Sequence, residues 1–217
     1  ELTWALILAL AKNVTIDDRA MREGKWQTAV GTEIRGKTLG VIGLGRIGSE
    51  VAKVGNAFGM EVIAWSENMT RDWAEECGAE LVSKDDLFRR SDYVVVIVIQ
   101  SDRTIGLVGA HEIGLMKPDA YLINPARGPI VDEAALVDAL QNNKIAGAGL
   151  DVYDVEPLPV DHPLRSLPNT VLMPHVAGFT REHYAHWYNG MMEDVRAWLD
   201  GEIINEIHGS GIVAARV

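Results

Sequence analysis

The chain has 217 residues, 47% of them hydrophobic and 24% charged, with a formal net charge of −11 at pH 7. This composition is ordinary for a soluble globular protein, and the length allows one large domain or two small ones. The acidic balance argues against a surface that binds nucleic acid, which would need clustered Lys and Arg. The single cysteine, Cys77, excludes an internal disulfide and predicts an inert thiol in a reducing compartment, for which we expect the cytoplasm.

The apolar segment 2–11 is too short for a membrane span, which needs about 20 residues. It follows Glu1 rather than a basic region, so it does not have the pattern of a signal peptide. We predict a packed amphipathic helix here and no membrane partner. The chain begins with Glu rather than Met, and we expect the natural protein to extend upstream.

Short runs rich in Val and Ile alternate with stretches of helical spacing along the rest of the chain. The predicted strands are 38–42, 61–65, 80–82, 93–99, 120–124, 145–151 and 170–173. The predicted helices are 47–58, 70–77, 84–90, 109–116, 132–141 and 182–200. Segment 93–99 is apolar at nearly every position, as in a parallel strand buried on both faces. The alternation predicts an α/β fold with a doubly wound parallel sheet, the Rossmann-like NAD(P)-binding fold.

A glycine-rich motif, Gly43-Leu44-Gly45-Arg46-Ile47-Gly48, directly follows the predicted strand 38–42 and opens the next predicted helix. In such a motif the first glycine makes a tight turn, the second lets the backbone approach a pyrophosphate, and the third lets helix and strand pack closely. The helix start, at Arg46 and Ile47, offers free N–H groups and the positive end of the helix dipole. Because strand, motif and helix occur in this order, we predict a dinucleotide site at Gly43, Gly45 and Gly48.

A weaker signal follows the predicted strand 61–65. A carboxylate about 20 residues after the glycine motif normally binds the ribose hydroxyls of NAD. Ser66 stands where an Asp is expected, and Glu67 comes immediately after it. Glu67 either repels a 2′-phosphate or is a solvated loop charge, and the first basic residue to follow is Arg71. We predict Ser66 at the ribose and NAD as the cofactor, with NADP as the alternative.

Three further blocks carry a resemblance to a known family. They read Asn124-Pro125-Ala126-Arg127-Gly128-Pro129-Ile130-Val131-Asp132, Gly149-Leu150-Asp151-Val152-Tyr153-Asp154-Val155-Glu156-Pro157 and Met173-Pro174-His175-Val176-Ala177-Gly178. Together with the glycine-rich block 36–48, they closely resemble the D-isomer-specific 2-hydroxyacid dehydrogenases. The resemblance runs from about residue 24 to residue 200, in the order and spacing of that family.

The resemblance implies a reaction and three catalytic residues. The family transfers a hydride between a nicotinamide cofactor and a 2-oxo acid or D-2-hydroxy acid. Arg127 is similar to the arginine that binds the substrate, and its planar guanidinium suits a carboxylate and a carbonyl oxygen. His175 is similar to the acid/base that serves the carbonyl oxygen. Glu156 is similar to the carboxylate that orients this histidine and favours its charged form.

The resemblance also implies the walls of the cofactor groove. Asp151 is similar to the residue that contacts the nicotinamide carboxamide. The other residues expected beside the cofactor are Val98, Ile99, Pro125, Ala126, His175 and Gly178, and no metal is expected. Segment 99–103 departs from the family, which usually has a proline-containing turn there, so the loop on the nicotinamide side is expected to differ.

The family's domain arrangement divides the chain into three segments. Residues 1–30 are expected to form a connecting helix and a dimerisation arm, and residues 31–181 the dinucleotide-binding domain. Residues 182–217 are expected to form a helix and tail that return to a substrate domain. In the family that domain begins ahead of this sequence and supplies the second wall of the active site.

Two expectations follow from this arrangement. The chain alone should bind cofactor but show little turnover, with His175 facing solvent and with Leu6, Ile7 and Leu10 exposed. The family's usual assembly, together with the partly apolar arm from Val14 to Trp26, predicts a homodimer.

Two functions remain open. The first is an enzyme of the glyoxylate or hydroxypyruvate reductase kind or of the phosphoglycerate dehydrogenase kind. The second is a non-catalytic module that senses the dinucleotide state, like the family's transcriptional corepressors, which can keep the same three residues. An S-adenosylmethionine enzyme on a similar sheet predicts no such order of Arg, Glu and His and is excluded. The residues not predicted to form a site are His111, His162, His183, His186 and His208, which lack a motif, and Trp187 and Trp198, which are expected to pack.

Overall fold

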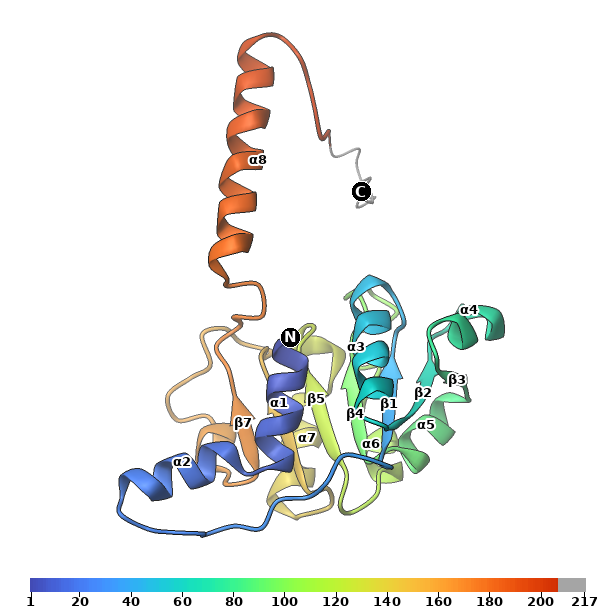
Figure 1. The fold of residues 1–217 in the computed structure, drawn as a ribbon, viewed down its shortest axis with the longest axis vertical. Helices are drawn as coiled ribbons and strands as arrows, with labels where there is room; N and C mark the ends of the chain where they lie inside the picture. Colours follow the sequence, from blue (N-terminus) through green and yellow to red (C-terminus); the bar gives the residue numbers. More distant parts are fainter. Residues whose placement is uncertain (207–217) are drawn as a thin grey trace. The chain divides into compact units, whose positions relative to one another are not determined.

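The computed structural model describes residues 1–206, and the chain forms two compact units, Glu1–Ala177 and Gly178–Val217 (Figure 1). His208 lies outside the described residues. The sheet and the helices that cover it belong to the first unit, and one long helix makes up most of the described part of the second.

Seven parallel strands form the sheet of the first unit. They are β1 (Thr38–Ile42), β2 (Glu61–Trp65), β3 (Glu80–Leu81), β4 (Tyr93–Val96), β5 (Tyr121–Asn124), β6 (Gly147–Leu150) and β7 (Thr170–Leu172). Their order across the sheet is β3-β2-β1-β4-β5-β6-β7, and every neighbouring pair is parallel. This order reverses between β1 and β4, as in the doubly wound Rossmann sheet, so the predicted fold class is confirmed.

Helices cover both faces of the sheet. The helices of the first unit are α1 (Leu2–Ala11), α2 (Val14–Arg22), α3 (Arg46–Ala57), α4 (Arg71–Glu76), α5 (Lys84–Arg90), α6 (Ala110–Leu115) and α7 (Glu133–Gln141), with two 3₁₀ turns at Gly128–Ile130 and Pro163–Ser166. Residues of α1, α3 and α4 join one buried cluster, and residues of α5, α6 and α7 join another. Successive strand residues alternate between the clusters, for example Val94 and Val96 in one and Tyr93 and Val95 in the other, because side chains in a strand point to opposite faces.

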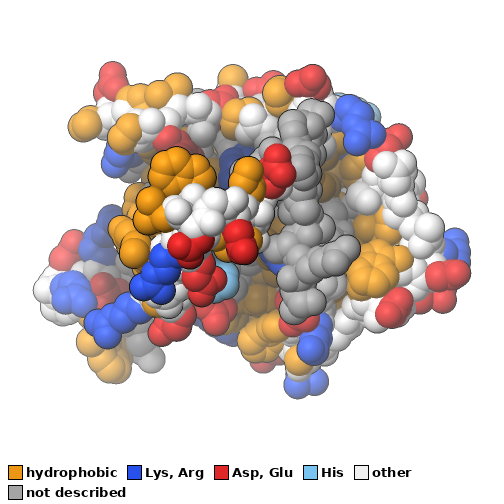
Figure 2. Space-filling model, turned by 90° about the horizontal axis from the view of Figure 1, so that it is seen from above, with side chains coloured by type: hydrophobic (Ala, Val, Ile, Leu, Met, Phe, Trp, Pro, Cys, Tyr) orange, Lys and Arg blue, Asp and Glu red, His pale blue; other side chains and the backbone are white. Residues whose placement is uncertain are grey.

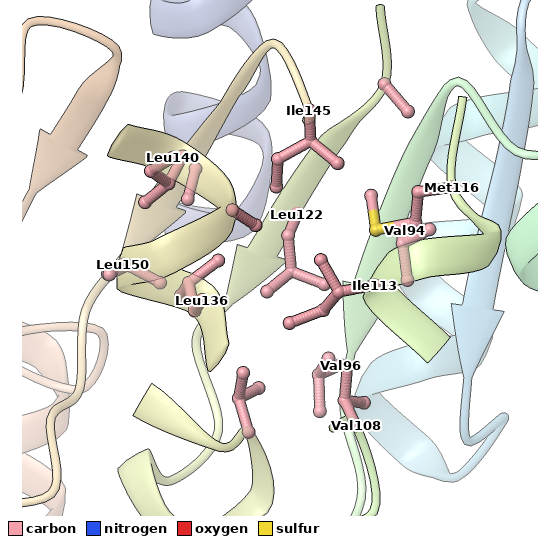
Figure 3. Packing of buried hydrophobic residues seen from close by; sticks show 14 of the residues in the cluster. Val94, Val96, Val108, Ile113, Met116, Leu122, Leu136, Leu140, Ile145 and Leu150 are labelled. Carbon is pink, nitrogen blue, oxygen red and sulfur yellow. The ribbon is translucent and has the colours of Figure 1, made fainter. Parts of the chain in front are cut away.

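The packing on the face of α6 and α7 is shown in Figure 3. Leu122 of β5 lies between Ile113 of α6 and Leu136 of α7. All three side chains are buried, so they hold both helices against the middle of the sheet. The parallel pairing of β4 with β5 places the carboxyl ends of these two strands next to each other.

Side chains mark the starts of several helices. Thr70, Ser83 and Asp132 each accept the backbone N–H three residues on, which satisfies one of the unpaired N–H groups of α4, α5 and α7. Helix 84–90 and strands 38–42 and 61–65 have the predicted bounds. Asp132, predicted as the first residue of a helix, instead caps it from outside.

The strand predicted at 93–99 is shorter in the structure and ends at Val96. The N–H of Ile97 still donates to the carbonyl oxygen of Ile42, at 2.9 Å, but the chain then leaves the sheet. An apolar run identifies a buried strand, but it does not show where the hydrogen-bonded partner strand stops. The predicted strand 145–151 is shortened to Gly147–Leu150 in the same way.

The first helix corrects two expectations. Leu6, Ile7 and Leu10 are buried against β5, β6 and β7 rather than exposed. The helix is packed as predicted, but it is not amphipathic, because its sequence LTWALILALA is apolar on nearly all sides. An all-apolar helix of this kind belongs to the core of the domain.

A second helix, α2, was not predicted. Val14, Met21 and the later Trp26 expose most or about half of their surface in this segment. In the second unit, α8 (Arg181–Leu199) is capped by Thr180 and has no buried residue. Trp187, expected to pack, contacts the rings of His183 and Tyr184 but is half exposed, and Trp198, also expected to pack, is exposed.

The surface of the described residues is mixed. Figure 2 shows acidic, basic and hydrophobic side chains interspersed on the face that it draws. Within residues 1–206, no helix combines the length and the apolar character that crossing a bilayer requires. Burial, followed by the charge of Glu76, raises the pKa of the Cys77 thiol, which is the direction expected of an unreactive cysteine.

Candidate active site

The glycine-rich turn joins β1 to α3 where the strand order of the sheet reverses. Gly43 has a φ of +96°, and a Cβ there would collide with the carbonyl oxygen of Ile97 and lie 2.8 Å from Cγ1 of Val98. A Cβ on Gly48 would collide with the carbonyl oxygen of Gly43. Glycine at these two positions is therefore required by the protein's own backbone, for the tight turn and for the close packing of helix and strand.

Gly45 is different, because no contact with residues 1–206 requires a glycine there. Its φ of −74° and ψ of −169° suit any residue, and a Cβ would meet no atom of the described residues within 4 Å. Along the described chain, the N–H groups of residues 44–48 have no hydrogen-bond acceptor, and the side chains of Arg46 and Ile47 are exposed. Open space beside unpaired N–H groups at a helix start fits the pyrophosphate of a dinucleotide.

Three more of the predicted cofactor residues follow the neighbouring strands. Ser66 comes after β2, whose last residue, Trp65, accepts the N–H of Gly43 at 2.9 Å. Val98 and Ile99 come after β4; Val98 packs partly against the core, whereas Ile99 is 74% exposed. All three thus lie at the carboxyl edge of the sheet, where doubly wound sheets bind their ligands.

The loop after Ile99, where the sequence departs from the family, is held by a hydroxyl rather than by a proline. The hydroxyl of Thr104 accepts the N–H of Ser101 at 2.7 Å and donates to the carbonyl oxygen of Ile99 at 2.8 Å. These bonds give the loop a defined turn.

The Arg127 turn follows β5. The side chain of Asn124, which is buried, donates to the carbonyl oxygen of Arg127 at 3.0 Å and accepts the N–H of Ala126 at 3.1 Å. The turn, including Pro125, is therefore shaped by one amide group. The Arg127 guanidinium is exposed, and its Nη1 donates to the carbonyl oxygen of Ala126 at 2.6 Å.

The Arg127 turn lies against the segment that carries Glu156. A Cβ on Gly128 would collide with the backbone of Tyr153, so the two segments are in close contact. The charge of Arg127 also acts on Glu156 and lowers the pKa of its carboxyl group. The missing side chain at Gly128 thus lets the segment of Arg127 approach the segment of Glu156, two residues predicted to be catalytic.

Glu156 and His175 form the closest pair of predicted catalytic groups. Nδ1 of His175 and Oε2 of Glu156 are 2.7 Å apart, and Oε1 of Glu156 accepts the N–H of Tyr153 at 3.0 Å. Partial burial raises the pKa of Glu156, but the bonds from His175 and Tyr153 outweigh it, so the pKa lies below its ordinary value. The imidazole is 42% exposed, so it remains open to a ligand.

The backbone of His175 has an unusual conformation that a buried carboxylate holds in place. Its φ is +56°, in the left-handed region that non-glycine residues rarely adopt. Asp151 has no exposed surface, and its two oxygens accept the N–H groups of Val176 and Ala177 at 2.9 and 3.0 Å. Asp151 therefore fixes the segment directly after His175. Its predicted contact with the nicotinamide stays a prediction.

A cavity of about 510 Å³ opens beside the pair. It is lined by Tyr153, Glu156, Pro157, Leu158, Arg165, Leu172, Met173, Pro174 and His175. Tyr153 donates its hydroxyl proton to the carbonyl oxygen of Met173 at 2.9 Å, and burial raises the pKa of this hydroxyl to about 12. Tyr153 thus stays neutral and braces one wall beside His175.

Sequence reasoning missed the residues that shape these turns. Asn124 and Tyr153 lie inside the recognised blocks, but nothing in a pattern of letters shows that their side chains bond to the backbone. Gly178 opens the second unit, so its place beside a cofactor stays a prediction. Within residues 1–206 no group of His, Cys, Asp and Glu is arranged to hold a metal ion.

The fold and the glycine-rich turn define a dinucleotide-binding α/β domain. The chain belongs to the D-isomer specific 2-hydroxyacid dehydrogenases, because the model of that family's NAD binding domain matches residues 4–177. It is 42% identical over 225 residues to a glyoxylate reductase of Aeropyrum pernix, covering 100% of this chain and 67% of the relative. It is 47% identical over 180 residues to a D-3-phosphoglycerate dehydrogenase of Archaeoglobus fulgidus, covering 82% of this chain and 34% of the relative.

Solved structures show the same likeness. The crystal structure of a phosphoglycerate oxidoreductase from Vibrio cholerae superposes with a TM-score of 0.87 at 32% identity, covering 92% of this chain and 65% of that one. The chain thus spans between about a third and two thirds of the length of these relatives.

Proposed function

We propose that the protein to which this chain belongs interconverts a 2-oxo acid and a D-2-hydroxy acid, with a nicotinamide dinucleotide bound at the glycine-rich turn. The observation that carries the proposal is the Glu156–His175 pair, 2.7 Å between oxygen and nitrogen, within reach of the charge of Arg127. A base, its carboxylate partner and a guanidinium at the carboxyl edge of such a sheet are the groups this reaction needs.

Each group has one task. The Arg127 guanidinium, bonded here only to a neighbouring carbonyl among the described residues, exchanges that contact for the substrate carboxylate. Glu156 engages Nδ1 of His175, which leaves Nε2 for the carbonyl oxygen. The bound nicotinamide supplies the hydride to the carbonyl carbon. His175 gives its proton to the oxygen during reduction and takes it back during oxidation.

The substrate class is tested with the full-length protein. NADH and NADPH oxidation should be followed with glyoxylate, hydroxypyruvate, a phosphorylated three-carbon 2-oxo acid and bulkier 2-oxo acids. Turnover with at least one of them, giving the D-product, is expected. Tight dinucleotide binding without turnover on any acid would favour the dinucleotide-sensing module instead.

NAD is expected to bind more tightly than NADP. Glu67 is exposed two residues after β2 and would repel a 2′-phosphate, while the charge of Arg71 acts on Glu80 of β3. Calorimetry should give the dissociation constants of NAD and NADP for the parent chain and for Glu67→Gln. The ratio of the NADP constant to the NAD constant should be smaller in the variant than in the parent. A parent chain that prefers NADP would overturn the assignment.

We further propose a homodimer in the cytoplasm. The exposed Val14, Met21 and Trp26 of the arm support an interface there, because exposed apolar patches on a protein surface mark interaction sites. Sedimentation at micromolar concentration should give twice the chain mass, and a monomer would contradict the proposal. The exposed apolar residues of α8 likewise support the predicted return of residues 182–217 to a substrate domain.

A further inference from the structure

One side chain outside every predicted motif is bonded to the glycine-rich turn. The indole N–H of Trp73, on α4, donates to the carbonyl oxygen of Leu44, with 2.8 Å between nitrogen and oxygen. Thr70 accepts the backbone N–H of Trp73 at 3.3 Å and so caps the start of α4, the helix that carries the indole. The Trp73 side chain reaches across from the segment after β2 to the segment after β1.

This bond sets the orientation of the peptide unit between Leu44 and Gly45. In a planar trans peptide, the C=O and the N–H of the same unit point in opposite directions. With the Leu44 oxygen held by Trp73, the Gly45 N–H points away from the indole. That N–H has no acceptor among the described residues, and the space at Gly45 is open.

The other contacts of the turn do not set the orientation of the Leu44–Gly45 peptide. The N–H of Gly43 is bonded to Trp65, and the Leu44 side chain is buried in the core. Neither contact engages the Leu44 oxygen. If the peptide unit rotated, that oxygen would turn toward a bound phosphate and repel it, and the Gly45 N–H would turn away.

We propose that Trp73 is a positioning residue for the pyrophosphate of the dinucleotide. Its indole N–H holds the Leu44–Gly45 peptide so that the Gly45 N–H donates to a phosphate oxygen. The proposal rests on the dinucleotide site proposed above. It assigns to Trp73 a role toward phosphate and none toward the adenosine or the nicotinamide.

The test is Trp73→Phe, which keeps an aromatic ring and removes the donor. Calorimetry on the 217-residue chain should compare NAD, ADP and adenosine. For the variant, NAD and ADP should bind about 3- to 10-fold more weakly, as the loss of one hydrogen bond predicts, while adenosine is unchanged. The matched control is Trp198→Phe, at a side chain that is 71% exposed, which should leave all three affinities unchanged.

Two results would overturn the proposal: ADP binding that is unaffected by Trp73→Phe, or an equal loss for ADP and adenosine, which marks a structural role of the ring. If Trp73→Phe does not fold, benzothienylalanine at position 73 replaces the N–H by sulfur at nearly the same shape, and the same ratio is measured. A parent chain that binds neither NAD nor ADP would show that the dinucleotide site itself is wrong, and the role of Trp73 with it. Binding of NAD or ADP by the parent chain therefore tests the dinucleotide site, and the comparison with Trp73→Phe tests the role of Trp73.

Discussion

Replacing His175 with alanine is expected to lower kcat for reduction by the full-length enzyme about 10²- to 10⁴-fold, the contribution of a positioned acid/base. The variant loses the imidazole whose Nδ1 is held 2.7 Å from Glu156 and whose Nε2, without a hydrogen-bond partner within residues 1–206, is proposed to serve the substrate oxygen. Arg127→Ala should lower kcat and, unlike His175→Ala, should also raise KM. The reason is that the guanidinium binds the substrate carboxylate before the reaction as well as during it. Steady-state kinetics of both variants with the preferred 2-oxo acid measures the difference.

A companion variant, Glu156→Gln, separates the charge of the pair from its geometry. In the parent, the pKa of Glu156 is lowered, so its side chain stays ionised below the ordinary pKa of a glutamate. The negative charge beside His175 is lost only as pH falls through that lowered pKa. A glutamine can keep a hydrogen bond but cannot stabilise the imidazolium. The pH above which reduction declines should therefore move down in Glu156→Gln, and an unchanged pH–rate profile would contradict the pairing.

The sequence predicts those parts of the site in which the backbone geometry requires a particular residue type at a particular position. Gly43 needs a positive φ and Gly48 needs room for another backbone, so strand, turn and helix are recognisable from their letters. The ends of elements are less predictable. Segment 93–99 is apolar at nearly every position, yet β4 stops at Val96, which pairs with Ile42, the last residue of β1.

Contacts between distant segments are harder still to predict from sequence. Asp151 was assigned to the cofactor from resemblance, and the folded chain shows both of its oxygens bonded to the residues after His175. Leu6 and Ile7 were expected to be exposed, but they pack on strands more than a hundred residues later in the chain. Trp73 is bonded to a carbonyl 29 residues away. Each of these interactions depends on which helices, strands and loops contact one another in the folded chain. A local sequence pattern does not predict those contacts.

Gly45→Val is expected to abolish measurable NAD binding without lowering the stability of the chain. The backbone at Gly45 has a φ of −74° and a ψ of −169°, which valine adopts readily, and a Cβ there touches no atom of residues 1–206. The added methyl groups would fill the space beside the free N–H groups of the turn. Loss of two charge-assisted hydrogen bonds to phosphate alone weakens binding on the order of 100-fold.

The matched variant, Gly48→Val, should instead lower the stability of the chain. Its Cβ would collide with the carbonyl oxygen of Gly43, so α3 would have to move away from β1 and the thermal midpoint should fall. Thermal denaturation and calorimetry on both variants distinguish a glycine that the ligand needs from one that the fold needs. If Gly45→Val bound NAD like the parent, the pyrophosphate would lie elsewhere. If it unfolded like Gly48→Val, the open space at Gly45 would not exist in solution.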